Sequence, residues 1–329
     1  MQGFSFDIQN KLGIMEQDIF TRLCNYRIEN PAFAREHEYR KGASLMKIAI
    51  VTDSGSGLTK QQASELGIYY LPLQIIIQDK MFLDGENITV EEIYEYLRNG
   101  EMPTTSMPPM GLVEELFTQL NEEGYEAVIA VPLSGGLSST SSVMQAVAKE
   151  HKVNLHVIES YTTCNIQRYL AESARQLIKQ GHDLETIVER LRASAADSGT
   201  LIIPDDLQHL KRGGRLTPLA AALGGLLKIK PILRLDRESE GKVDVYDKVR
   251  TMSKAQSKAI STFQERGLNE AYTLTVLHSG APKEGEKLKA MMEEAFPGLD
   301  LYYGLIGAVI SAHTGVGCLG IQYIRKVEM

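Results

Sequence analysis

The sequence lacks the features that mark secreted and membrane-spanning chains. It contains only three cysteines, Cys24, Cys164 and Cys318, which are widely separated and form no C-x-x-C pair. An odd, scattered set of this kind argues against a disulfide framework and fits reduced thiols in a cytoplasm. No apolar run reaches the roughly 18 residues that a membrane helix requires, and the N-terminus has no basic-then-apolar signal pattern. We therefore expect a cytoplasmic protein.

An excess of positive charge is also absent. The formal net charge is -7, so the sequence implies no broad basic surface and no nucleic-acid partner. The best-placed histidines, His278 and His313, have no His, Cys or carboxylate neighbour at metal-ligand spacing. We therefore expect no metal site and no cofactor.

The length and composition indicate a globular protein. A chain of 329 residues with 43% hydrophobic residues is long enough for two domains of ordinary size. Strong patterning begins only at Met46, where the apolar segment "MKIAIVTDS" starts. Lys41, Gly42 and Ala43 can be encoded by codons containing a bacterial ribosome-binding purine run. We therefore interpret residues 1–45 as a non-native or disordered leader and Met46 as the physiological start; a real but poorly packed extension is the alternative.

From Met46 onward, strand-like and helix-like patterns alternate, which predicts a parallel sheet. Thr89 and Glu92 form a capping-box pattern at the start of one helix. After about residue 200, "KIKPILRL" and "KVDVYDKV" flank "DRESEG" as a hairpin, and three further strands follow with two intervening helices. The predicted fold class is α/β, with a parallel-sheet α/β domain over residues 46–200 and an α+β domain over residues 201–329. The predicted strands and helices of the first domain are 47–52, 59–66, 68–77, a helix opened by Thr89, 111–120, 126–131, 139–149, 154–158, 166–180 and 184–196.

Several catalytic motifs appear only in incomplete form. Gly315, Gly317 and Gly320 match G-x-G-x-x-G, but a strand-like segment follows them and the chain ends nine residues later. Neither the helix nor the acidic ribose partner of a dinucleotide site is available there. "GAPKEGEK" has Glu286 where a phosphate-binding loop requires lysine. The sequence therefore offers no nucleotide site of either kind.

The segment "VPLSGGLSSTSSV", residues 131–143, has more hydroxyl side chains than a turn requires. It follows an apolar run and precedes a helix, so hydroxyls, backbone N–H groups and the positive end of a helix dipole meet there. This combination predicts an anion site. "GLSST" also resembles the nucleophile elbow G-x-S-x-G, with Thr140 in place of the last glycine. A serine hydrolase that acts on a lipid or acyl ester through Ser138 and His313 is therefore the alternative.

Seven sequence blocks occur in a fixed order: "VTDSGSGL", "TSMPP", "LSGGLSST", "KRGGRL", "LLKIKPIL", "VRT" and "ISAHTGVGCLG". Together they resemble the DegV family, which includes the fatty-acid-binding subunits of bacterial fatty acid kinase. The resemblance extends from Met46 to the C-terminus. Two positions depart from the family pattern, which commonly has Gln at Met107 and Gly at Ser139.

The resemblance implies a carrier, not an enzyme, that buries a long-chain fatty acid in a tunnel between or beside its two domains. A separate ATP-binding fatty acid kinase subunit would phosphorylate the carboxylate, which links the protein to phospholipid metabolism. Lipid exchange would involve transient membrane contact. Thr105, Ser138 and His313 match the residues that bind the carboxylate. Residues that match positions for phosphoryl transfer or partner docking are Arg250, Arg215 and His313.

Each assignment has a simpler structural alternative. Ser138 could only cap the following helix, Thr105 could only shape its loop, and His313 could be a satisfied core histidine. Arg215 and Arg250 could be solvated surface charges. Five further candidates for the site come from the same polar segments: Asp53, Ser54, Ser106, Ser139 and His278.

Overall fold

The computed structural model describes residues 46–223 and 229–329. The predicted leader, residues 1–45, lies outside the described residues. The first sheet has four parallel strands in the order β2-β1-β6-β7. These strands are β1 (Ile48–Asp53), β2 (Tyr69–Leu71), β6 (Ala127–Val131) and β7 (Leu155–Val157).

Helices cover both faces of this sheet because successive strand residues point to opposite sides. Ile50 packs with α3, α7 and α8, whereas Ala49 and Val51 pack with α5 and α6 on the other side. This arrangement confirms the predicted parallel α/β architecture. The helices are α3 (Lys60–Glu65), α5 (Met110–Glu122), α6 (Thr140–Glu150), α7 (Asn165–Gln180) and α8 (Leu184–Ala196).

A second, six-stranded sheet has the order β10-β9-β8-β13-β11-β12 and begins at Ser198. Strands β11 and β12 of this sheet pair in parallel, and its other neighbouring strands pair in antiparallel orientation. The predicted hairpin is the antiparallel pair of β9 and β10. Helices α11 (Met252–Glu265) and α12 (Pro282–Ala295) pack on one face. The strands are β8 (Ser198–Ile203), β9 (Lys230–Asp236), β10 (Asp244–Val249), β11 (Tyr272–His278), β12 (Asp300–Leu305) and β13 (Leu319–Arg325).

A third, antiparallel sheet in the order β4-β3-β5 was not predicted. The apolar run 68–77 divides at Pro72, so its halves belong to different sheets. The segment "PTTSMPPM", predicted as a loop, contains a strand of three residues, too short for a periodic pattern. Helix α4 (Val90–Arg98) follows the hairpin of β3 and β4 and begins with the predicted capping box. The strands are β3 (Gln74–Ile77), β4 (Lys80–Leu83) and β5 (Thr104–Ser106).

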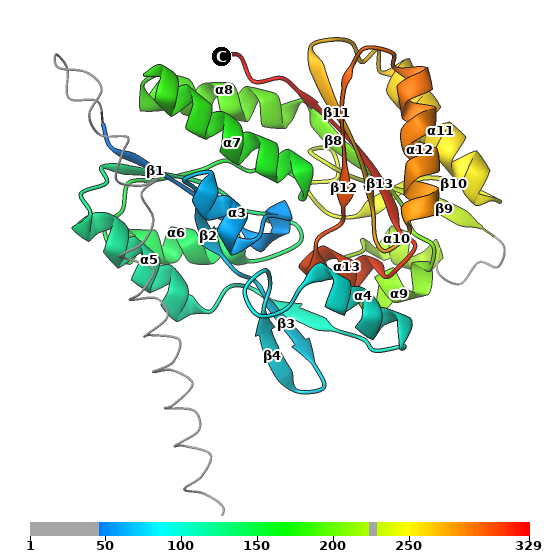
Figure 1. Ribbon diagram of the computed structural model, residues 1–329, viewed down its shortest axis with the longest axis horizontal. Coiled ribbons are helices and arrows are strands. Elements are labelled where there is room, and N and C mark those ends of the chain that lie inside the picture. The colour runs from blue at the N-terminus through cyan, green and yellow to red at the C-terminus, as the bar shows by residue number, and fades with distance from the viewer. Residues whose placement is uncertain (1–45, 224–228) are drawn as a thin grey trace, which may run out of the picture.

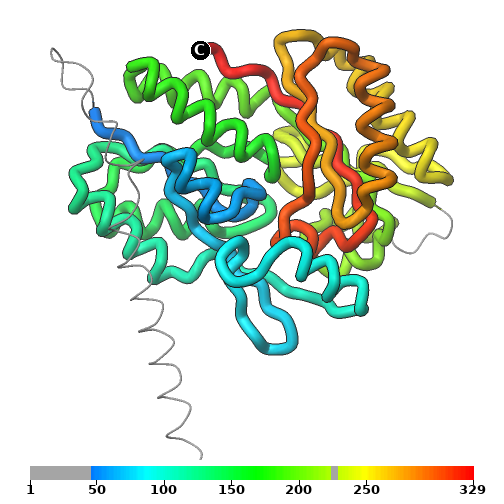
Figure 2. The backbone as a smooth tube through the Cα atoms, in the orientation of Figure 1, coloured from blue at the N-terminus to red at the C-terminus, as the bar shows by residue number. Residues whose placement is uncertain are grey.

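Three short helices were also missing from the prediction: α9 (Leu207–Arg212), α10 (Pro218–Ala222) and α13 (Ala308–Thr314). The polar segment "SAHTG" therefore lies partly in a helix. Helix α13 contacts α4, α9 and β5, and Figure 1 shows it at the lower ends of β11, β12 and β13. In Figure 2 the cyan segment that contains β3, β4 and α4 runs beneath both larger sheets. The three sheets therefore converge around α13.

Candidate functional site

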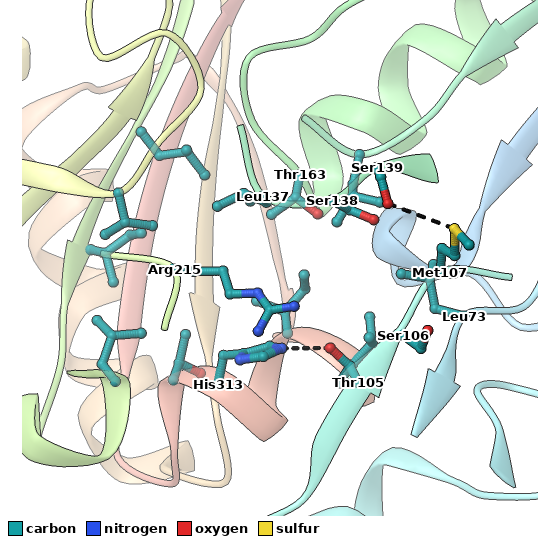
Figure 3. Close-up of a pocket in the computed structure, with 18 residues that line it drawn as sticks. Leu73, Thr105, Ser106, Met107, Leu137, Ser138, Ser139, Thr163, Arg215 and His313 are labelled. Carbon is teal, nitrogen blue, oxygen red and sulfur yellow. Dashed lines mark hydrogen bonds between the residues drawn. The ribbon is translucent and has the colours of Figure 1, made fainter. Parts of the chain in front are cut away.

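A cavity of about 300 Å³ lies where elements of the three sheets meet. Its apolar wall combines residues of β8 and β9, in the second sheet, with residues of α9 and α13 and of the segments that follow β2, β5 and β6. Its polar groups gather where β5, α13 and the loop before α6 approach one another (Figure 3). The apolar residues are Leu73, Met107, Leu133, Leu137, Ile202, Leu210, Leu235, Val243, Val309 and Ile310; the polar residues are Thr105, Ser106, Ser138, Ser139, Thr163, Arg215, His313 and Thr314.

Thr105 and His313 form the central polar contact of the cavity. The Thr105 Oγ1 and His313 Nε2 atoms are 2.6 Å apart, although 208 positions separate the two residues. Burial and the positive charge of Arg215 lower the pKa of His313 to about 4. The imidazole is therefore neutral near neutral pH, and either atom of the pair can donate, depending on the tautomer.

The "KRGGR" segment fits closely around this imidazole. A Cβ at Gly213 would lie 2.8 Å from His313 Nδ1, so a larger residue at position 213 would displace the His313 imidazole. Gly214 has φ +73°, a left-handed conformation that glycine tolerates best. Arg215 donates from its guanidinium to the Gly213 carbonyl at 2.9 Å and lines the cavity. The segment thus places a permanent cation beside a neutral imidazole, as Figure 3 shows.

The loop before α6 supplies the hydroxyl groups. Ser138 Oγ lies 2.8 Å from Thr140 Oγ1 and also accepts from the Thr140 backbone N–H, so Ser138 does help to begin the helix. Ser139 has no side-chain capping hydrogen bond, and its hydroxyl donates weakly to Met107 Sδ at 3.6 Å. Met107 and Ser139, the two positions where the sequence departs from the pattern of the resembling family, are thus in contact. The start of an eleven-residue helix with adjacent hydroxyls can accept an anion.

The hairpin of β9 and β10 closes one side of the cavity. Leu235 and Val243, on either side of its turn, both line the cavity. The turn packs on the hydroxyl loop, where the Ser134 hydroxyl donates to the Gly241 carbonyl at 2.9 Å. A Cβ at Gly136 would lie 2.3 Å from that same carbonyl oxygen. The apolar wall and the hydroxyl loop are therefore packed directly against each other.

The structure brings six of the ten predicted site residues into the cavity wall: Thr105, Ser106, Ser138, Ser139, Arg215 and His313. In Figure 3 the Ser106 side chain points away from His313. The other four candidates do not line the cavity. His278 is buried at the end of β11, where its ring packs near Tyr303 and its Nδ1 accepts from the Ala281 N–H. Arg250 is exposed after β10.

Asp53 and Ser54 are buried behind the cavity wall. Asp53 Oδ2 accepts from the Leu133 N–H at 2.9 Å, and Ser54 Oγ accepts from the Leu73 N–H at 3.1 Å. Their side chains therefore position residues of the wall, a role that the sequence pattern did not distinguish from direct lining.

Sequence reasoning missed two polar residues of the wall and most of its apolar residues. Thr163 lies in a segment with no distinctive spacing, and Thr314 directly follows His313. Ile202 and Leu210 belong to a strand and a helix that the periodicity did not reveal. The "AHTG" segment that drew attention to His313 was the one signal available for Thr314.

The geometry gives no support to a serine hydrolase. A nucleophile and its base must be within hydrogen-bond reach, and a third group must orient the base. Here Ser138 pairs with Thr140, His313 pairs with Thr105, and His313 Nδ1 has no hydrogen-bond partner among the described residues. Ser138 also lacks the positive φ of a strained elbow.

Residues 46–223 and 229–329 contain no group of three or more His, Cys, Asp or Glu residues that could hold a metal ion. Within the same ranges, none of the helices is both long and apolar enough to cross a membrane.

Known sequences and solved structures that are similar to this chain come from one family. The model of the DegV family matches residues 47–326. A DegV domain-containing protein of Halalkalibacterium halodurans is 34% identical over 286 residues, which cover 86% of this chain and all of the relative.

Two solved structures are similar over most of this chain. DegV from Bacillus subtilis, described as a fatty acid binding protein, has a TM-score of 0.75 at 33% identity, covering 85% of this chain and 100% of that chain. The fatty acid binding DegV family protein SAG1342 from Streptococcus agalactiae has a TM-score of 0.79 at 31% identity, covering 85% and 99%. This chain therefore belongs to the DegV family.

Proposed function

We propose that this protein binds a long-chain fatty acid in the described cavity and acts as a carrier without catalytic residues of its own. The main support for the proposal is the division of the cavity into an apolar wall and a polar end that contains Thr105, Ser138 and His313. A fatty acid has the same division, with an apolar chain and a single carboxylate.

The two parts of the ligand would bind through different forces. Burying an acyl chain of about sixteen carbons releases on the order of 12 kcal/mol, before the costs of association and ordering are subtracted. A carboxylate removed from water needs several hydrogen-bond donors. The hydroxyls of Ser138 and Thr105 and the start of α6 would supply them. The acyl chain would therefore provide most of the affinity, and the hydroxyl groups would orient the carboxylate.

The relatives support this proposal. The similar Bacillus subtilis and Streptococcus agalactiae proteins are described as fatty acid binding. A related structure from Thermus thermophilus, with 28% identity and a TM-score of 0.76 over 85% of this chain and 100% of that chain, is described in the same terms.

We further propose that a separate ATP-dependent fatty acid kinase phosphorylates the bound carboxylate, in the bacterial cytoplasm and as a step of phospholipid metabolism. Neutral hydroxyl donors would leave the carboxylate oxygens nucleophilic and accessible to such a partner. Transient membrane contact would allow lipid exchange.

Arg250 is our candidate for docking the partner or the transferred phosphoryl group. It is exposed and has no ion-pair partner among the described residues, and arginine suits acidic or phosphorylated surfaces. Arg250→Ala should retain bound lipid but slow acyl phosphate formation when the kinase and ATP are supplied. Arg237→Ala, at an exposed arginine in the β9–β10 turn, is the matched control. Phosphorylation of Arg250→Ala at the wild-type rate, or loss of its lipid, would contradict this role.

Removing the lipid tests the carrier proposal itself. A ligand that binds only the folded state stabilises it by about 2.7 kcal/mol at a hundredfold excess over Kd. The delipidated protein should therefore melt at a lower temperature, and added palmitate or oleate should restore the higher value. A melting temperature that no fatty acid shifts would oppose the proposal.

A further inference from the structure

The polar end of the cavity is the end nearer to the surface. Ser139 is exposed and Met107 is half-buried, whereas Ile202 and Leu235, in the apolar wall, are buried. A carboxylate bound beside Ser138 would therefore lie close to solvent. The side chains around it decide whether water and reagents reach it.

A contact between Met107 and Ser139 spans this end of the cavity (Figure 3). Met107 directly follows β5, which carries Thr105, and Ser139 directly precedes α6. The Ser139 hydroxyl donates to Met107 Sδ at 3.6 Å, although 32 positions separate the two residues. The contact thus joins the strand that carries Thr105 to the loop that carries Ser138, the two hydroxyl donors of the proposed carboxylate site.

The backbone of Met107 is held in place. Its carbonyl oxygen accepts from Gln74 Nε2, on β3, at 2.7 Å. The next residue, Pro108, is buried, and a proline restricts both its own φ and the conformation of the residue before it. Movement at this position is therefore movement of the side chain. A methionine side chain is unbranched and has three rotatable bonds, so it can change position while the backbone stays fixed.

The Met107 side chain is held more weakly than its polar neighbours. A thioether sulfur is a weak acceptor, and the Ser139 hydroxyl has no capping bond that would tie it to α6. In contrast, Thr105 and His313 are joined at 2.6 Å, and Arg215 donates to a backbone carbonyl at 2.9 Å. The contact between Met107 and Ser139 therefore costs less to break than either of these.

We propose that the Met107 side chain is a movable cover over the carboxylate end of the cavity, held closed by Ser139. The proposal rests on fatty acid as the ligand of the cavity. With the cover closed, the thioether keeps water away from the bound carboxylate. With Met107 in another rotamer, the carboxylate faces solvent and a reagent or an enzyme can approach it. The same site would thus both hold a fatty acid and present it.

The test measures how fast a water-soluble carbodiimide and an added amine convert bound palmitate into its amide. The carbodiimide activates the carboxylate, the amine then displaces the urea by-product, and mass spectrometry quantifies the amide. Protein is kept in excess over palmitate, so that the ligand reacts in its bound state. Met107→Ala removes the cover and should form amide at least about fivefold faster than the wild type, the factor that corresponds to about one ordinary hydrogen bond.

Met110→Ala is the matched control, because Met110 is 55% exposed and does not line the cavity. It should react like the wild type. Ser139→Ala and Met107→Leu each remove the weak hydrogen bond but keep most of the cover, so each should raise the rate by about twofold to threefold. The two changes together should have no larger effect than either alone, because both remove the same contact.

Three results would overturn the inference: a wild-type rate in Met107→Ala, an equal rise in Met110→Ala, or loss of palmitate from Met107→Ala in ultrafiltration. The last result would mean that Met107 holds the ligand and does not cover it. Fully additive effects of Ser139→Ala and Met107→Leu would contradict the closing role of Ser139. Failure of the wild type itself to bind palmitate would instead reject the proposed function.

Discussion

At the scale of single residues, Thr105 has the most direct test. Thr105→Val keeps the size and branching of the side chain but removes the hydroxyl that faces His313. Loss of a hydrogen bond to a charged ligand group costs roughly 1.5 to 3 kcal/mol, which corresponds to roughly a tenfold to hundredfold weaker affinity for palmitate. Thr104→Val, at the exposed neighbour on β5, is the control and should bind normally. Equal affinities for the two variants would remove Thr105 from the site.

Asp84 should make stability depend on pH in a defined direction. Burial raises the pKa of Asp84 from 3.8 to about 7. The folded state therefore holds a proton between these values that the unfolded state has lost, and the free energy of unfolding falls as pH rises through this range. Asp84→Asn removes this contribution.

Urea denaturation of both proteins at about pH 5 and about pH 8 measures the effect. The stability of Asp84→Asn relative to the wild type should increase with pH. His313, whose pKa is lowered to about 4, remains in both proteins and cancels in the comparison. Asp53, whose pKa burial raises to about 6, is also present in both, and its negative charge raises the pKa of Asp84 in the same direction as burial. A stability difference that is constant or falls with pH would contradict the assignment.

Residue patterns identified the polar end of the cavity better than its wall. Thr105 and His313 were assigned through the resemblance to the DegV family, and Ser138 stood out in addition because hydroxyls cluster in the segment between two predicted elements. The same reasoning selected Asp53 and Ser54, because a strand end contains several polar residues and their rotamers decide which of them face the cavity. Ile202 and Leu235 have no local signal, since they resemble any other buried strand residues.

At the scale of elements, the contact between the hydroxyl loop and the β9–β10 turn is the most sensitive to change. In Gly136→Ala the new Cβ would meet the Gly241 carbonyl oxygen at 2.3 Å, so the loop and the turn must separate. We expect a loss of about 1 to 3 kcal/mol in unfolding free energy. Palmitate should also bind more weakly, because Leu235 and Val243 move with the turn.

Gly111→Ala provides the matched control, since a Cβ at Gly111 meets nothing within 4 Å. Alanine should stabilise that position of α5 by up to about 1 kcal/mol. Thermal denaturation and palmitate titration of both variants give the comparison. Unchanged stability and affinity in Gly136→Ala would show that the contact is not rigid.

Long elements were predictable from periodicity, and short ones were not. The positions of α7 and α8 match the predicted ranges closely because sixteen and thirteen residues give several repeats of a helical pattern. β5 and α13 have three and seven residues, and the contacts that stabilise them come from distant parts of the chain. These two elements carry Thr105 and His313, so the sequence could indicate the residues but not their arrangement.

At the scale of the whole molecule, we predict that the folded part of the protein begins at Met46. The matched family region begins at Lys47, and strand β1 begins at Ile48. A protein that begins at Met46 should therefore have the same melting temperature and the same affinity for palmitate as the full chain. A clear loss of either property would show that residues 1–45 contribute to the folded protein. The division into domains at residue 200 stays a prediction.

The central claim, a fatty acid in the cavity between the sheets, is tested most directly by mass spectrometry of the lipid extracted from the purified protein. The account predicts about one long-chain fatty acid per folded chain, since the cavity has one polar end. Thr105→Val should yield less lipid than Thr104→Val prepared in parallel. An extract without fatty acid, from a protein that also takes up neither palmitate nor oleate after delipidation, would contradict the account.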